Sequence, residues 1–135
     1  MNAIAGILLL LTAIVAPARP GWLGVGLIPH RSGSESWVTV QVLAPGGPAE
    51  RAGLHVGDIV TDLDGKPFRF RSDLDMLEQL SRIRPGQLVK MQIVRAQQTM
   101  TVSVTAAPMS DSAYERWLGN LEYARLAAAR QKPAP

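Results

Sequence analysis

Apolar and polar residues alternate along six short stretches of the chain, and this alternation indicates a protein built mainly from β-strands. A strand with one buried face places every second side chain on that face. The pattern covers residues 22–28, 37–43, 59–63, 66–70, 88–94 and 99–105. Between two of these stretches, Asp64-Gly65 is a strong signal for a tight hairpin. The polar segment from His30 to Ser36 is expected to be a loop.

Two segments between the strands carry helix signals instead. Residues 48–52 begin with proline and are followed by Gly53, which predicts one short helical turn. Ser72 is placed to cap a helix that runs to about Arg84, where Pro85-Gly86 ends it. We therefore expect an α+β fold, a small and partly open β-sandwich or barrel of about six strands with two helices, over residues 21–107.

The apolar face of the longer helix is wider than contact with one sheet requires. Met76, Leu80 and Ile83 fall close together on a helical projection, while Leu74 lies on another side and Leu77 between them. Two interpretations remain open. Either one core wraps the helix, or Leu74 and Leu77 face the core while the other three line an open groove that would accept an aliphatic side chain.

The first 18 residues differ from the rest of the chain. Residues 3–16 carry no charge, and Ala16-Pro17-Ala18 forms the small-residue pattern of a signal-peptidase site. We expect residues 1–18 to be a signal peptide, with an uncleaved membrane anchor or a buried helix as alternatives. The protein would then be periplasmic or secreted, or anchored in the inner membrane if the leader is retained. The expected domains are 1–18, a body at 19–107, and a C-terminal amphipathic helix with a frayed tail at 108–135.

Composition narrows the function classes. The chain has no cysteine, which excludes disulfides, a thiolate zinc site and a cysteine nucleophile. The net charge of +3 is small for 135 residues, and the basic side chains are spread out. We therefore expect no nucleic-acid partner, and contact with a membrane only if the leader is retained.

No residue pattern typical of an enzyme or a cofactor site is found. His30 and His55 both lie in predicted loops, and no serine stands in a nucleophile elbow. Gly24-Val25-Gly26 lacks the third glycine and the following helix of a dinucleotide site. Three aspartates with calcium-like spacing lack the glycine and terminal glutamate of an EF-hand loop: Asp58, Asp62 and Asp64. We therefore expect a non-catalytic protein without catalytic residues, metal or cofactor.

Three ordered blocks of the chain resemble a PDZ domain of the bacterial HtrA/Deg periplasmic serine protease type. They read "WLGVGL", "VLAPGGPAERAGLHVGDIVTDLDGKPF" and "SDLDMLEQLSRIRPGQLVKMQIVRAQQTMTVSV". The resemblance covers residues 21–105 and does not include a protease domain.

The resemblance implies a binding mode. The C-terminal tail of a partner would add as an antiparallel strand beside residues 25–28, and its carboxylate would bind backbone N–H groups of the loop before them. The glycines would let that backbone be approached closely. The implied peptide-binding residues are Trp22, Leu23, Gly24, Val25, Gly26, Leu27, Met76, Leu80 and Ile83.

Two positions depart from the family pattern. Met76 stands where eukaryotic members often carry a histidine that recognises a hydroxyl, so we expect a hydrophobic preference here. A basic residue before the loop often supports the carboxylate, and Arg19 is the candidate for that role.

The C-terminal helix lies outside the resemblance. Ser112 and Glu115 form a capping box, and an apolar stripe follows it: Tyr114, Trp117, Leu118, Leu121 and Ala124. The helix would pack on its own domain, cover the groove, bind a partner or a second copy, or lie on a membrane.

The function expected from these features is a non-catalytic envelope module that binds hydrophobic C-termini or exposed strands, as an adaptor or regulator in protein quality control. The alternatives are a membrane-anchored assembly component of a secretion or envelope complex, and a fragment of an HtrA-type protease. An envelope protease or a secretion component would be the larger partner. The sequence does not identify the ligand or the oligomeric state.

Overall fold

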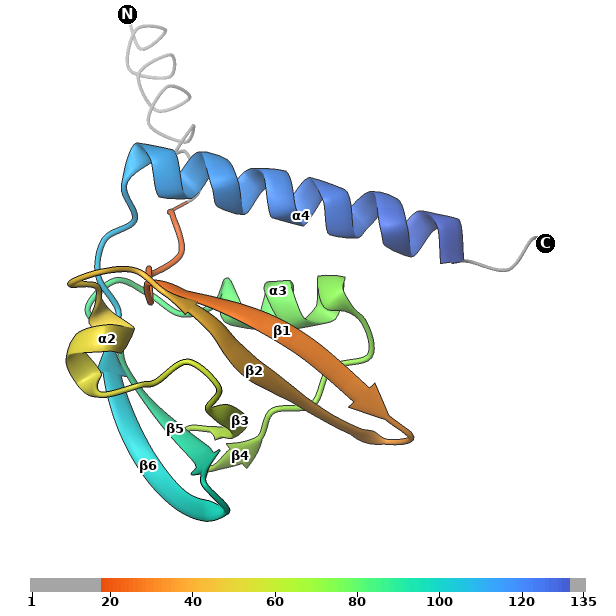
Figure 1. Ribbon diagram of the computed structural model, residues 1–135. Coiled ribbons are helices and arrows are strands. Elements are labelled where there is room, and N and C mark those ends of the chain that lie inside the picture. Colours follow the sequence, from red (N-terminus) through yellow and green to blue (C-terminus); the bar gives the residue numbers. More distant parts are fainter. Residues whose placement is uncertain (1–17, 132–135) are drawn as a thin grey trace, which may run out of the picture.

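The computed structural model describes residues 18–131, so the expected leader lies outside the described residues except for Ala18. Six strands form one antiparallel sheet in the order β1-β2-β3-β5-β6, with β4 paired to β3. Their bounds are β1 Val25–Ser32, β2 Glu35–Leu43, β3 Ile59–Leu63, β4 Lys66–Pro67, β5 Leu88–Arg95 and β6 Gln98–Thr105. The helices are α2 Pro48–Ala52, α3 Asp73–Leu80 and α4 Asp111–Gln131 (Figure 1). The predicted α+β class is confirmed.

The sheet curls around an aliphatic core. In β5 and β6 buried and exposed residues alternate strictly over most of each strand, as the sequence pattern predicts. The most deeply buried aliphatic side chains come from four strands and the segment after α2: Val38, Val40, Leu54, Val60, Val89, Ile93 and Val104. Phe68 and Phe70 close one end of this core with an edge-to-face contact of 5.2 Å between ring centroids.

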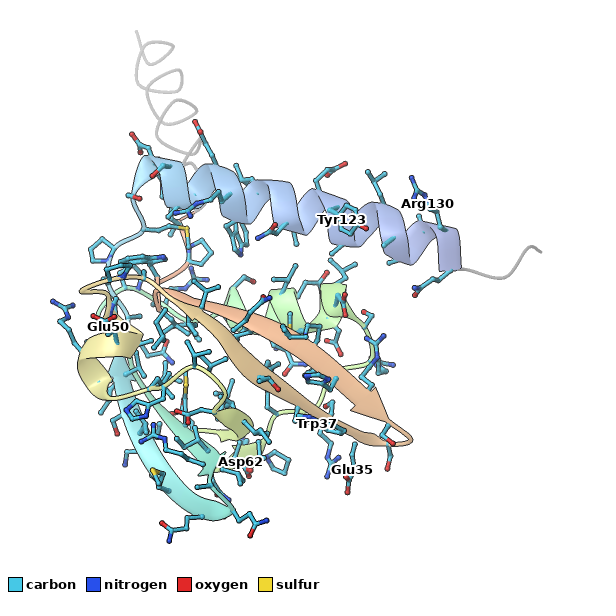
Figure 2. The ribbon with its side chains drawn as sticks, in the orientation of Figure 1. Glu35, Trp37, Glu50, Asp62, Tyr123 and Arg130 are labelled. Carbon is cyan, nitrogen blue, oxygen red and sulfur yellow. The ribbon has the colours of Figure 1, made fainter. Side chains whose placement is uncertain are left out.

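The predicted loop from His30 to Ser36 is wrong, because most of it continues β1 and β2 into a long hairpin. The strands turn at Gly33, which has a φ of +60°. This end of the hairpin extends beyond the core. The two strands can therefore pair there although their side chains are polar, because none of these side chains has to be buried. Glu35 and Trp37 lie there (Figure 2), and the Trp37 ring stacks on His30 with centroids 5.6 Å apart.

The longer predicted helix is shorter in the structure, since α3 ends at Leu80 instead of about Arg84. The backbone N–H groups of Arg82 and Ile83 donate to Gln79 and Leu80 in a tight turn. The Ile83 carbonyl then accepts a 2.7 Å hydrogen bond from Gly21 N–H, and the Ile83 side chain is buried in the core.

Helix α4 packs across α3 and over the start of β1 (Figure 1). A bridge between Trp22 and Ala107 joins the chain before β1 to the segment that leads into α4. Ser110, whose Oγ accepts from Ala113 N–H at 3.2 Å, caps the helix, so the predicted capping box at Ser112 was placed two residues too late. In residues 18–131 no helix combines the length and the apolar character that crossing a membrane requires.

Candidate functional site

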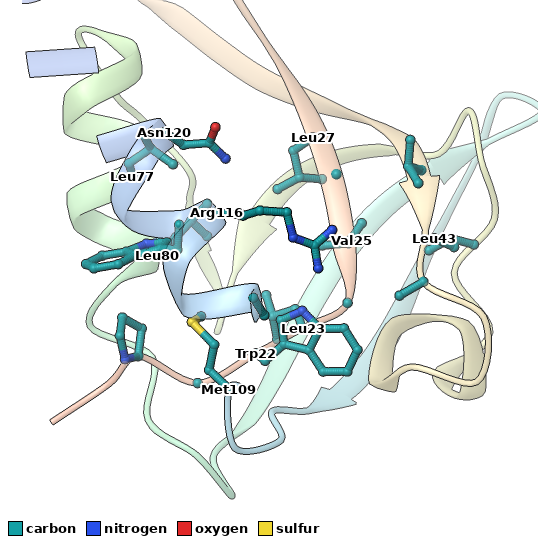
Figure 3. A pocket seen from close by; sticks show the side chains of 18 of the residues that line it. Trp22, Leu23, Val25, Leu27, Leu43, Leu77, Leu80, Met109, Arg116 and Asn120 are labelled. Carbon is teal, nitrogen blue, oxygen red and sulfur yellow. The ribbon is translucent and has the colours of Figure 1, made fainter. Parts of the chain in front are cut away.

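A cavity of about 680 Å³ lies where the edge strand β1, helix α3 and helix α4 meet (Figure 3). Pockets for small ligands and peptides typically fall in this size range. One wall is the chain from Pro20 to Leu27 with the end of β2, the second is α3, and the third is α4. Arg116 is the one charged side chain among the described residues that line the cavity, and the rest of the wall is mostly apolar.

The loop before β1 exposes backbone donors to this cavity. The carbonyl oxygens of Leu23 and Gly24 face away, accepting 2.9 Å hydrogen bonds from Ala49 and Ala44. The N–H groups of Leu23 and Gly24 donate to no protein acceptor in the described part of the chain. Gly24 has a φ of +69°, a left-handed conformation that suits glycine. Successive N–H groups arranged in this way form an anion-binding concavity.

The first residue of β1 continues the row of donors. The hydrogen bond between Gly24 and Ala44 makes Val25 and Leu43 a non-hydrogen-bonded pair of the antiparallel ladder. Val25 therefore directs its backbone groups away from β2. Because β1 is an edge strand, these groups are available to a further strand on the cavity side.

Helix α3 supplies the facing apolar wall through Met76, Leu77 and Leu80. This assignment differs from the predicted groove, which contained Ile83 and left Leu77 in the core. Because α3 ends at Leu80, the helical spacing does not extend to position 83, and Ile83 joins the core instead. The residues of the β1 wall lie where the sequence placed them: Trp22, Leu23, Gly24, Val25, Gly26 and Leu27 all line the cavity.

The first turns of α3 are fixed by hydrogen bonds. Ser72 Oγ accepts from Asp75 N–H at 3.1 Å, and the Asp75 carboxylate accepts from Arg71 N–H at 2.8 Å and from Gln79 at 3.2 Å. The bond from Arg71 is the main cause of a lowered pKa for Asp75, helped by Gln79 and opposed by partial burial. Met76 follows directly, so these hydrogen bonds also fix its position in the α3 wall of the cavity.

Helix α4 provides the wall that the sequence did not assign. Successive residues of one helical face line the cavity: Ala113, Arg116, Trp117 and Asn120, preceded by Met109. The helix is held down by the burial of Ala113, Leu121 and Ala124. The apolar stripe at Trp117 and Leu121 was the signal for this contact, although Leu118 of the predicted stripe is 42% exposed.

Arg19 does not support the cavity loop as expected. Its guanidinium lies 2.7 Å from the Asp111 carboxylate, donates to the Met109 carbonyl at 3.2 Å, and stacks 4.6 Å from the Tyr114 ring centre. These contacts engage Arg19 with the first turn of α4, outside the cavity wall. Its role is to anchor that helix to the chain before β1.

The histidines and aspartates considered above lie elsewhere. His30 Nε2 is 3.0 Å from Thr39 Oγ1, and the His55 backbone N–H donates to the Asp58 carboxylate. Asp64 accepts from Lys90 N–H at 2.9 Å in the hairpin after β3. Within residues 18–131, no group of three or more histidine, aspartate or glutamate side chains is arranged to hold a metal ion.

Comparison with known proteins agrees with this geometry. The PDZ domain family matches residues 21–106. The serine endoprotease DegS of Escherichia coli is 34% identical over 68 residues, 50% of this chain and 19% of the relative. A probable periplasmic serine endoprotease of the DegP-like type from Pseudomonas fulva is 35% identical over 102 residues, 67% of this chain and 21% of the relative. The chain thus spans about a fifth of the length of these curated relatives.

Solved structures give the same fold. The HtrA-type protease AlgW with a decapeptide is 25% identical, with a TM-score of 0.56 over 68% of this chain and 30% of its own. The serine endoprotease of Yersinia pestis, 23% identical, has a TM-score of 0.53 over 81% of this chain and 36% of its own. The match to DegS and DegP-like proteins covers the PDZ-sized part and not their protease domains. On the family match and the fold together, this chain belongs to the PDZ domain family.

Proposed function

We propose that this protein is a non-catalytic binding module that captures hydrophobic C-termini or exposed strands of other proteins. The peptide would add to the edge of β1 as an antiparallel strand, between β1 and α3. The observation that carries the proposal is the set of unpaired backbone donors at Leu23 and Gly24, at the end of an apolar cavity beside a free strand edge.

The chemistry of each wall fits one part of such a peptide. The terminal carboxylate would accept hydrogen bonds from the N–H groups of Leu23, Gly24 and Val25, and hydrogen bonds to a charged acceptor are stronger than neutral ones. The last side chain would enter the space between Leu23 and the α3 residues Met76 and Leu80. Burial of one aliphatic side chain contributes about 1.5–3 kcal/mol. A short peptide also loses freedom on docking, so micromolar affinity is expected.

The relatives support a proposal for the cellular role. Some are named as periplasmic serine endoproteases, and the HtrA-type protease AlgW was solved with a decapeptide. We propose that this protein acts in the periplasm, as an adaptor or regulator in protein quality control. An envelope protease would then be its larger partner.

Fluorescence polarisation with paired peptides tests the binding mode. Each pair shares one sequence ending in valine and differs only in a free or an amidated C-terminus. We expect the free acid to bind about tenfold more tightly. Equal affinity of the two forms would show that the carboxylate-binding assignment is wrong.

A pair of leucine variants tests the location. Leu80→Glu places a carboxylate in the cavity wall and should abolish binding of the acid peptide. Leu88→Glu is the matched control, because Leu88 is 51% exposed on β5 and does not line the cavity. Retained binding by Leu80→Glu, in a protein folded by circular dichroism, would place the peptide elsewhere.

A further inference from the structure

Arg116 holds a position in the cavity that the PDZ segment itself does not supply. It is carried by α4, which begins after the family match at residues 21–106 ends. It is the one charged side chain among the described residues that line the cavity. Figure 3 shows the side chain directed from α4 into the cavity, toward the start of β1.

The Arg116 guanidinium is also available for a ligand. It forms no ion pair and no hydrogen bond with another side chain or carbonyl in residues 18–131. No aspartate or glutamate of the described chain shares the cavity wall with it. A cation in an apolar wall without a protein partner favours an anionic ligand group, and the planar guanidinium suits a carboxylate best.

We infer that Arg116 binds the terminal carboxylate of the captured peptide, together with the free N–H groups of Leu23 and Gly24. This inference rests on the proposed function and adds a specificity-determining residue to it. The carboxylate would be bound from two sides, by the loop before β1 and by α4. Helix α4 is then a constitutive wall of the site, and a ligand without a free carboxylate loses both sets of contacts.

The anchoring of α4 supports this assignment. The residues that line the cavity are spaced three and four apart on one helical face: Ala113, Arg116, Trp117 and Asn120. Arg19 fixes the beginning of that helix through Asp111, the Met109 carbonyl and Tyr114. Arg19 is thus a positioning residue, and Arg116 is the cation that faces the ligand.

Arg116→Gln tests the inference in the full chain, with the same acid and amide peptide pairs ending in valine. Arg125→Gln is the matched control, because it removes the same charge from an exposed position of α4 outside the cavity wall. We expect Arg116→Gln to weaken binding of the acid about threefold and to leave the amide unchanged, so that the acid preference that remains, about threefold, is due to the loop N–H groups. Arg125→Gln should preserve both affinities, and both variants should unfold at the wild-type temperature because both side chains are exposed.

Salt gives a second readout. Because Arg116 is exposed to solvent, its attraction for a carboxylate is screened by ions. The acid preference of the wild type should fall as sodium chloride rises, and this part of the salt dependence should be absent in Arg116→Gln.

The outcomes separate the two proposals. If the wild type prefers the acid and Arg116→Gln keeps that preference in full, the inference about Arg116 is wrong while carboxylate capture by the loop stands. Tighter binding of both peptides by Arg116→Gln would also overturn it, since α4 would then obstruct the groove. A wild type without any acid preference would refute carboxylate capture itself, and the role of Arg116 with it.

Discussion

Arg95, at the end of β5, binds the buried carboxylate of Asp58 with two hydrogen bonds of 2.8 and 2.7 Å. Asp58 is 1% exposed and also accepts from the His55 N–H at 2.8 Å. Arg95 donates further to the Gly53 carbonyl at 2.8 Å, which ties the end of α2 to the sheet. Because Ala49 of α2 holds the Leu23 carbonyl, this ion pair supports the loop that forms the cavity.

Arg95→Met should destabilise the fold by about 3 kcal/mol, because it leaves a buried carboxylate without its cation. Urea denaturation measures the free energy of unfolding. Arg51→Met is the control, since Arg51 is exposed on α2 and forms no ion pair among residues 18–131; it should change stability by less than about 0.5 kcal/mol. A loss below about 1 kcal/mol for Arg95→Met would show that the pair is dispensable.

The free energy of unfolding should depend on pH because of the ion pair between Asp58 and Arg95. Burial alone would raise the pKa of Asp58, but the hydrogen bonds from Arg95 and from the His55 backbone outweigh it and lower the pKa below its ordinary value of 3.8. A carboxylate whose pKa is lower in the folded than in the unfolded state stabilises the fold at pH values above its unfolded-state pKa. This stabilisation is lost as the pH falls through its folded-state pKa. Urea denaturation at a series of pH values should therefore show stability falling below about pH 4.

Asp58→Asn provides the control for this pH dependence. We expect this variant to be less stable at neutral pH. Its stability should fall less steeply below about pH 4, with the remaining slope due to Asp75 and other carboxylates. Parallel curves for the two proteins would show that Asp58 has the same pKa folded and unfolded.

Sequence reasoning succeeded where the pattern was local and failed where the contact was distant. The strands and the left-handed Gly53 follow from alternation and turn chemistry within a few residues. The role of Asp58 depends on Arg95, which is 37 positions away, and nothing near Asp58 indicates it. The prediction of Ile83 in the groove depends on a helix that continues beyond Leu80, whereas α3 ends there.

The third wall of the cavity could not be assigned from the sequence either. The amphipathic pattern of residues 111–130 indicates a helix with a buried side, but not which surface buries it. The packing of α4 on α3 determines this, and the same packing brings Arg116 into the cavity. Arg19 is near the loop in sequence, which favours a role there, but its partners Asp111 and Tyr114 are more than 90 positions away in the sequence.

Gly24→Ala should reduce both stability and peptide binding. Gly24 has a φ of +69°, and an added Cβ would lie 3.2 Å from Pro48 Cδ. The left-handed conformation costs a residue with a side chain about 1–2 kcal/mol, so the loop would shift and misplace its N–H groups. Gly33→Ala is a matched control, because Gly33 has a φ of +60° in the distant hairpin turn with no atom within 4 Å of the new Cβ.

Both glycine variants should therefore lose stability in thermal unfolding, Gly24→Ala by more because of its contact with Pro48, while only Gly24→Ala loses affinity for the acid peptide in fluorescence polarisation. If Gly24→Ala and Gly33→Ala bind the acid peptide with the same affinity, the loop conformation at Gly24 does not matter for binding.

The turn between β5 and β6 offers a stabilising change. Ala96 and Gln97 connect paired residues Arg95 and Gln98 with φ values of +50° and +65°. Two positive φ values are typical of a turn that favours Asn-Gly. Replacing the pair by Asn-Gly should raise the free energy of unfolding by about 1 kcal/mol, because the left-handed strain is relieved. Urea denaturation measures the gain, and a loss would mean that Ala96 or Gln97 makes contacts worth more than the strain.

Leu121→Ala should loosen α4 without unfolding the sheet. Leu121 is 8% exposed, and removing a buried leucine side chain costs about 2–5 kcal/mol. Helix α4 is the last element of the described chain and packs on the outside of the sheet domain, so we expect local opening. Hydrogen exchange of α4 amides should become faster by about tenfold or more, with unchanged exchange in β5. Leu126→Ala is the control on the same helix, because Leu126 is 51% exposed. If Leu121→Ala alone loses the preference for the acid peptide, the packing of α4 on the domain contributes to ligand binding. If the two variants have the same hydrogen exchange in α4 and the same acid preference, Leu121 does not hold the third wall in place.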